Sequence, residues 1–191
     1  MIQTVPAPAL PFAHLAITDQ ASGATNLEGL AALGGALLLR DKHEKPSTRE
    51  GLAQMLRVAT TQLGIPLIIH GDAALARQVA ADGLHLPSHT PPGAIAGLIV
   101  GCSCHDEAEL DRAVAAGVDY VMLSPVLSSP GKSRPLGWDR FAALARRCPL
   151  PLFALGGLGP DDLAQARSHG AWGVAGIRGF LSSNWSKDPG T

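Results

Sequence analysis

The chain has 191 residues, of which 46% are hydrophobic and 16% charged, and its formal net charge at pH 7 is -1. This composition favours one globular domain with a well-buried core and excludes a largely disordered chain. No stretch gathers the lysines and arginines of a nucleic-acid surface, and no apolar run approaches the roughly 20 residues of a membrane span. Because three cysteines form an odd set without framework spacing, we expect no disulfide and a cytoplasmic protein.

Short apolar runs rich in Leu, Ile and Val recur along the chain, and most are followed by a helical pattern. This alternation indicates β–α units on a parallel sheet that is buried on both faces. We expect eight strands, at residues 14–19, 36–42, 66–71, 83–87, 98–104, 120–126, 150–157 and 172–179. They predict an α/β fold, a small single-domain (β/α)8 (TIM) barrel, for which the chain is short; a doubly wound open sheet is the alternative.

The clearest helical patterns cover residues 47–64, 106–118, 137–147 and 160–170. In the first of them, Ser47 and Glu50 have the spacing of a capping box at the N-terminus. We assign residues 13–180 to the barrel. We expect a loose N-terminal segment at 1–12 and a polar C-terminal tail at 181–191.

A CSCH segment at residues 102–105 raises the question of a metal site. We expect Cys102 and Cys104 to lie on a strand and to point to opposite faces of it, so that the two thiols cannot share an ion. The interpretation we favour is that Cys102 packs in the core and that the protein has no metal site.

Active-site residues of such barrels lie at the C-terminal ends of the strands. Here these ends carry mostly cations, hydroxyls and glycines, which suit a phosphorylated small molecule because N–H groups and arginines stabilise oxyanions. The last two strands end in Gly156 and Gly157, and in Gly176, Ile177 and Arg178. We predict that they form one phosphate cradle. The alternative is that the glycines only allow tight turns.

The ordered strand ends resemble the superfamily of thiamine phosphate synthase and thiazole tautomerase (TenI), small barrels of thiamine metabolism. The resemblance runs from LAITD to GVAGIRG and rests on LLLRDK, ADGLHLP, GVDYVMLSPV and ALGGLGPDDL in that order. The second half also resembles the synthase-like domain found fused behind a Nudix hydrolase in some bacteria. The resemblance implies thiamine biosynthesis or salvage, with a thiazole phosphate or thiamine phosphate as ligand; a homo-oligomer is left open.

The resemblance also implies roles for single residues. Arg40 and Lys42 match the basic pair that follows the second strand of the synthases. Ser103 matches the serine after their fifth strand, and Ser129 and Lys132 fall in their T-x-T-K loop. These five residues are the expected substrate-binding set. The cradle glycines match directly.

The two carboxylates that hold Mg²⁺ in the synthases are missing from this sequence. Gly71 and Thr90 occupy their positions, and Asp72 is the neighbouring acid that could supply one ligand. A synthase needs the divalent ion to neutralise the departing pyrophosphate. We therefore expect no cofactor, with Mg²⁺ only if synthase activity is retained.

The tautomerases need no metal, because moving a proton on a carboxythiazole phosphate requires only an acid–base group and a phosphate anchor. Their catalytic histidine aligns with Pro125. His70 and His105 lie at other strand ends and are the candidate catalytic residues, His70 first. His85 is expected to be structural and the other four histidines to lie at the surface. Three functions stay open: a tautomerase-like enzyme, a Mg²⁺-dependent synthase, and a barrel that only binds a phosphorylated ligand.

Overall fold

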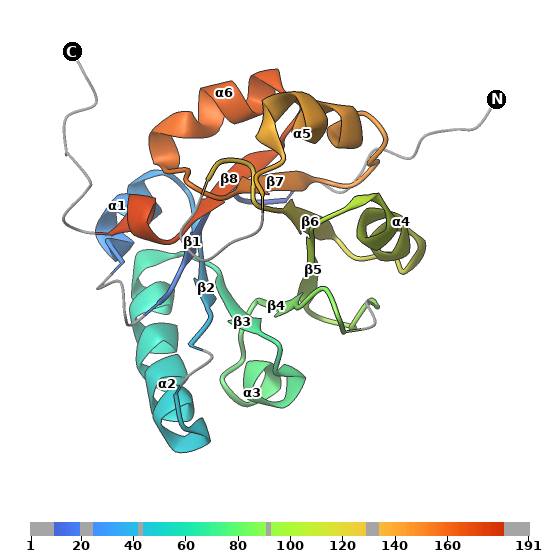
Figure 1. The fold of residues 1–191 in the computed structure, drawn as a ribbon. Helices are drawn as coiled ribbons and strands as arrows, with labels where there is room; N and C mark the ends of the chain where they lie inside the picture. The colour runs from blue at the N-terminus through green and yellow to red at the C-terminus, as the bar shows by residue number, and fades with distance from the viewer. Residues whose placement is uncertain (1–9, 20–24, 42–43, 91–92, 129–133, 182–191) are drawn as a thin grey trace, which may run out of the picture.

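The computed structural model describes residues 10–19, 25–41, 44–90, 93–128 and 134–181. Its eight parallel strands pair in sequence order, and the last closes the ring against the first (Figure 1). They are β1 (His14–Ile17), β2 (Ala36–Leu39), β3 (Leu67–His70), β4 (Gly83–Leu86), β5 (Ile99–Cys104), β6 (Tyr120–Leu123), β7 (Leu152–Leu155) and β8 (Gly173–Gly176). The expected (β/α)8 barrel is confirmed, and the open sheet is excluded.

The helices surround this ring of strands (Figure 1). They are α1 (Leu27–Ala32), α2 (Pro46–Leu63), α3 (Ala73–Gln78), α4 (Glu107–Ala115), α5 (Gly137–Ala145) and α6 (Leu163–Ser168), with the 3-10 turns η2 (Pro160–Asp162) and η3 (Arg178–Phe180). Between β4 and β5 the described residues contain no helix. No helix in the described part of the chain is long and apolar enough to cross a membrane. The chain has room for eight strands because most of the strands have only four residues and several of the helices have only six.

Helix α2 begins before its expected capping box. Lys45 precedes the helix in an extended conformation without a side-chain cap, and Pro46 is the first helical residue. Proline is favoured there because its fixed φ suits a helix and its missing N–H would have had no partner. Ser47 and Glu50 therefore lie inside the helix, and the capping box expected from them is wrong.

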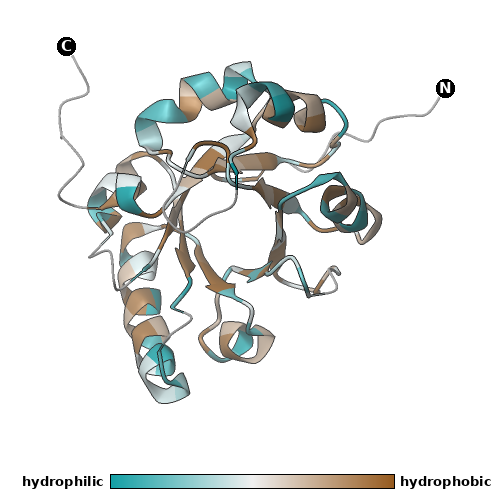
Figure 2. Cartoon of the chain, viewed as in Figure 1, coloured by the Kyte–Doolittle hydropathy of each residue, from teal (hydrophilic) through white to brown (hydrophobic). Residues whose placement is uncertain are grey.

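Side chains along each strand alternate between the barrel interior and the surrounding helices, as the two-residue period of a strand requires. Figure 2 shows the strands as mainly hydrophobic and parts of the outer helices as hydrophilic. The interior cluster consists of Leu10, Phe12, Leu15, Ile17, Ala36, Leu38, Ile68, Tyr120, Met122, Phe153 and Ala175. Leu10 and Phe12, which belong to the segment before the assigned barrel, are thus buried in its core.

Aromatic rings fill the interior near the N-terminal ends of the strands. Tyr120 and Phe153 lie edge to face with ring centroids 5.4 Å apart, and Phe12 packs 5.7 Å from Phe153. Glycines make room for them, because a Cβ on Gly101 would lie 2.0 Å from the Tyr120 ring and one on Gly173 would lie 2.6 Å from the Phe153 ring. Aromatic side chains thus occupy the interior at this end of the barrel.

The two cysteines of β5 share a face of the strand, which corrects the expectation that they point apart. Cys102 and Cys104 both pack in the cluster between strands and helices. The physical reason is the same two-residue period, since residues two apart on a strand point the same way. The expected burial of Cys102 is confirmed, with the side chain 3% exposed.

Candidate functional site

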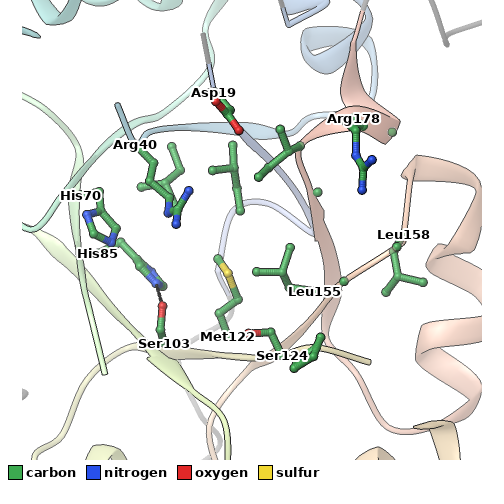
Figure 3. Close-up of a pocket in the computed structure, with 18 of the residues that line it drawn as sticks. Asp19, Arg40, His70, His85, Ser103, Met122, Ser124, Leu155, Leu158 and Arg178 are labelled. Atoms are coloured by element: carbon green, nitrogen blue, oxygen red, sulfur yellow. Dashed lines mark hydrogen bonds between the residues drawn. The ribbon is translucent and has the colours of Figure 1, made fainter. Parts of the chain in front are cut away.

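A cavity of about 750 Å³ lies at the C-terminal ends of the strands, and all eight strands or the residues just after them contribute to its lining. Its polar side carries Arg40, His70, His85 and Ser103, and Figure 3 shows Arg178 on the opposite side. Apolar side chains lie between these two sides: Ile17, Leu38, Met122, Leu155 and Ile177. This arrangement suits a ligand with an apolar ring and a polar or charged group.

The cavity lining includes both candidate histidines, both described members of the expected substrate-binding set, and the whole predicted cradle. These residues are His70, His105, Arg40, Ser103, Gly156, Gly157, Gly176, Ile177 and Arg178. Lys42, Ser129 and Lys132 lie outside the described residues. The strand-end rule therefore brought together, in one cavity, residues that are far apart in the sequence.

The loops after β7 and β8 form one continuous wall of this cavity. Gly156 and Gly157 have φ values of +119° and +70°, a conformation that other residues rarely adopt. The two loops touch through their backbones, because a Cβ on Gly179 would lie 2.6 Å from the Cα of Gly159. A Cβ on Gly176 would likewise lie 2.6 Å from the carbonyl oxygen of Leu158. Glycines here allow the tight turns of the alternative interpretation, and they also let the two loops pack closely; the phosphate cradle stays a prediction.

Two N–H groups of this wall are available to a ligand. Neither Gly157 nor Ile177 donates a backbone hydrogen bond to any of the described residues. Gly157 is exposed, and Arg178 is exposed beside it in the lining. Gly176 differs from them because it belongs to β8 and pairs with Ala16 of β1. Its contribution is therefore the lack of a side chain, which lets the Leu158 loop pack closely.

On the other side of the cavity, His85 is held between two hydroxyl groups. Its Nδ1 lies 3.0 Å from the Tyr120 hydroxyl and its Nε2 lies 2.8 Å from the Ser103 hydroxyl (Figure 3). Burial, with smaller contributions from Cys102 and Asp119, raises the pKa of Tyr120, so this hydroxyl stays protonated. The hydrogen bonds fix the His85 ring and, through it, the Ser103 hydroxyl at the cavity surface.

His85 lines the cavity, although the sequence predicted only a structural role for it. Its side chain is only 1% exposed, as expected for a structural residue, yet it lines the cavity. The sequence indicated this, because His85 lies between Leu84 and Leu86 on a strand. These two leucines pack between the strands and the helices, so His85 must point into the barrel. A polar ring buried there has to find hydrogen-bond partners.

The remaining histidines of interest differ in how they face the cavity. His70 is buried, and its ring stacks on His85 with centroids 6.0 Å apart at an angle of 28°. His105 is 45% exposed, and its Nδ1 lies 2.9 Å from a carboxylate oxygen of Glu109 on α4. His14 was expected at the surface but is buried, and burial lowers its pKa. His89 is exposed and lines the cavity mouth.

The described acids do not form the Mg²⁺ site that a synthase would need. Asp72 is already used, since its Oδ1 accepts the N–H of Leu75 at 2.9 Å and its Oδ2 lies 3.4 Å from Arg49. Gly71 and Thr90 offer no carboxylate. Within the described ranges, no group of three or more His, Cys, Asp or Glu residues is placed to hold a metal ion. The described residues by themselves therefore do not form a Mg²⁺ site.

Comparisons with known proteins agree with the expected family and fold. A family model described as thiamine monophosphate synthase matches residues 15–180. A putative thiamine-phosphate synthase of Geobacter sulfurreducens is 34% identical over 188 residues, covering 90% of this chain and 87% of that protein. The thiamine-phosphate synthase of Nitrosococcus oceani is 37% identical over 172 residues, covering 83% of this chain and 78% of that protein.

Solved structures show the same architecture. The thiamine phosphate pyrophosphorylase from Pyrococcus furiosus superposes with a TM-score of 0.76 at 24% identity, covering 87% of this chain and 86% of that one. At this identity the superposition shows only that the two folds are alike. The family itself is shown by the family model, which matches nearly the whole barrel by sequence. The chain belongs to the thiamine monophosphate synthase family.

Proposed function

We propose that the protein binds a thiazole phosphate of thiamine biosynthesis or salvage and moves a proton on its ring without a metal ion, as a thiazole tautomerase does. The observation that carries this proposal is one cavity with a buried histidine on one wall and, on the other, backbone N–H groups that have no acceptor among the described residues. A phosphate needs several donors, and a proton transfer needs one group that can both take up and release a proton.

The phosphate group would accept hydrogen bonds from the N–H groups of Gly157 and Ile177, with the Arg178 guanidinium adding positive charge. Donors that are fixed in place before the ligand arrives stabilise an anion without further reorganisation. The backbone of the Gly157 turn is held by its packing against Leu127 and Ser128. The phosphate would thus anchor the ligand at the wall formed by the β7 and β8 loops.

His70 would then act as the acid–base group at the thiazole ring. Histidine is the side chain most often used to take up and release a proton in enzymes, because an imidazole can serve as acid or base close to neutral pH. His70 would take a proton from one carbon of the non-aromatic tautomer and return a proton at the other end of the conjugated system, so that the double bonds shift and the thiazole ring becomes aromatic. Ser103, fixed by His85, and Arg40 would orient the ring and its carboxylate. Substrate-binding roles for Lys42, Ser129 and Lys132 stay predictions.

Two other functions are kept as alternatives. Two relatives carry the name thiamine-phosphate synthase, one of them as a putative synthase, which favours a Mg²⁺-dependent transferase. Against this stands the absence of a fitting metal site among the described residues. A barrel that binds the phosphorylated ligand without turning it over would use the same cradle, and would need no histidine.

The deciding experiment measures deuterium exchange and isomerisation of carboxythiazole phosphate by the wild type and by His70→Asn. The substitution should lower kcat by roughly 10²–10⁴, the usual contribution of a positioned acid or base, while leaving phosphate affinity nearly unchanged. His105→Asn is the matched control, because the His105 ring lies against Glu109 and should contribute little.

A wild-type protein that binds thiazole phosphates tightly but leaves them unchanged would replace the tautomerase proposal by the binding barrel. Full activity of His70→Asn together with a loss in His105→Asn would move the acid–base role to His105.

A further inference from the structure

Arg49, on helix α2, ties together the segment that carries His70. Its Nη2 donates a hydrogen bond to the carbonyl oxygen of His70, and its Nη1 lies 3.4 Å from Oδ2 of Asp72. Asp72 in turn accepts the N–H of Leu75 through its other oxygen and thereby caps α3. One guanidinium group therefore joins α2, the end of β3 and the start of α3.

Arg49 holds His70 at the point where the chain leaves the sheet, since His70 pairs with His85 of β4 and the N–H of Gly71 donates to the His85 carbonyl oxygen at 2.9 Å. His70 is the last residue of β3, and Gly71 then turns the chain out of the sheet with a φ of +69°. The helix that follows has only six residues, and a helix this short has little stability of its own. The planar fork of an arginine can hold two acceptors in one fixed geometry, which the flexible ammonium group of a lysine cannot.

The guanidinium of Arg49 is partly buried. The Arg49 side chain is 20% exposed, and its Nε is buried without a hydrogen-bond partner among the described residues. Arg49 does not line the main cavity; it lines a smaller neighbouring hollow of about 560 Å³ that His70 also borders. Its contact with the site thus passes through His70, whose backbone it binds and whose ring stacks on His85.

We infer that Arg49 is a positioning residue, which holds the His70 imidazole at the place where it can reach the ligand ring. The inference rests on the proposed function, because it assigns Arg49 a part in the same proton transfer. Arg49 itself does not touch the ligand; it sets the backbone position from which the imidazole projects.

The same helix supplies a matched control. About two turns further along α2, Nη1 of Arg57 lies 2.6 Å from Oδ2 of Asp82. That carboxylate oxygen also accepts the N–H of Leu67, the first residue of β3. Arg57 therefore ties α2 to the opposite end of the same strand, away from His70. Removing Arg57 deletes an arginine–aspartate pair of the same kind without disturbing the site.

The test compares Arg49→Met and Arg57→Met in the full chain. Both should lower thermal stability by similar amounts, but only Arg49→Met should lower kcat for the isomerisation, by about tenfold to a hundredfold, with little change in KM. Arg49→Lys should recover part of the loss, because it keeps one donor. The double variant Arg49→Met/His70→Asn should be no slower than His70→Asn alone, since Arg49 acts through that ring.

Equal losses of kcat in Arg49→Met and Arg57→Met would overturn the inference, as would multiplicative losses in the double variant. A second readout separates this inference from the proposed function. The NMR signals of the His70 imidazole, assigned with His70→Asn, should shift in Arg49→Met and stay in place in Arg57→Met. This comparison holds even if the wild type proves inert, and unchanged His70 signals in Arg49→Met would refute the positioning role.

Discussion

At the scale of single residues, the backbone N–H of Gly157 is the most direct test of the phosphate cradle. Gly157→Asp should abolish binding of thiazole phosphate, because it adds a negative charge beside the anion. Gly157→Asn is the matched control: both residues tolerate the positive φ better than most, and both add a Cβ about 3.1 Å from that of Leu127. The measurement is the Kd by calorimetry, with circular dichroism to confirm folding.

The two variants separate charge from shape. A Kd that rises much more in Gly157→Asp than in Gly157→Asn supports the cradle. Similar effects in both would mean that the turn matters only for packing. An unchanged Kd in folded Gly157→Asp would remove the cradle from the site.

The sequence predicted the location of site residues better than their surroundings. The strand-end rule was sufficient to gather His70, Arg40 and Ser103 in one cavity, because it depends only on the topology of the barrel. The role of His85 depends on side chains from β5 and β6 that meet it in space. No sequence pattern indicated a role for Arg49. Its partners are a backbone carbonyl oxygen and the aspartate that caps α3, and such contacts leave no pattern in a single sequence.

At the scale of elements, the strands were predictable because burial on both sheet faces leaves short apolar runs. The helix ends were less predictable. Lys45 gives α2 no side-chain cap, and the helix begins at Pro46, so the capping-box spacing next to it has no consequence. Contacts between side chains of neighbouring strands could not be predicted from the sequence either. The sequence shows glycine at 101 and tyrosine at 120, but only the β5–β6 register reveals that the ring occupies the space above the glycine.

The Gly101–Tyr120 contact leads to a prediction about the barrel interior. Gly101→Ala should destabilise the protein by about 1–3 kcal/mol or more, because the added methyl would lie 2.0 Å from the tyrosine ring. Gly51→Ala is the matched control: Gly51 lies in α2 with open space around it, so alanine should raise stability by roughly 0.5–1 kcal/mol. Urea denaturation measures both values.

A double-variant cycle checks the cause of that loss. In Gly101→Ala/Tyr120→Leu the shorter side chain removes the clashing ring atoms, so the combined destabilisation should be smaller than the sum of the single ones. Additive losses would show that the methyl group clashes with something other than the ring.

At the scale of the whole molecule, the proposed function assigns its two tasks to opposite sides of the barrel mouth. The end of β3, tied to α2 through Arg49, carries the proposed acid–base histidine, while the loops after β7 and β8 present the backbone donors proposed for the phosphate. Both sides belong to one closed ring of strands and line one cavity. Under the proposal, a ligand held at its phosphate on one side would meet the histidine on the other.

The last prediction concerns Mg²⁺. Mg²⁺ should change neither the melting temperature nor the affinity for thiazole phosphate, because Gly71 and Thr90 provide no carboxylate and Asp72 is engaged by Arg49. The double substitution Gly71→Asp/Thr90→Asp should create Mg²⁺ dependence in both measurements. Residue 71 has room for the change, since a Cβ there meets only Pro87 at 3.9 Å, and aspartate tolerates its φ of +69° better than most residues. Strong Mg²⁺-dependent condensation of a pyrimidine pyrophosphate with thiazole phosphate by the unmodified chain would show that the protein completes a metal site by other residues, and that it is a synthase.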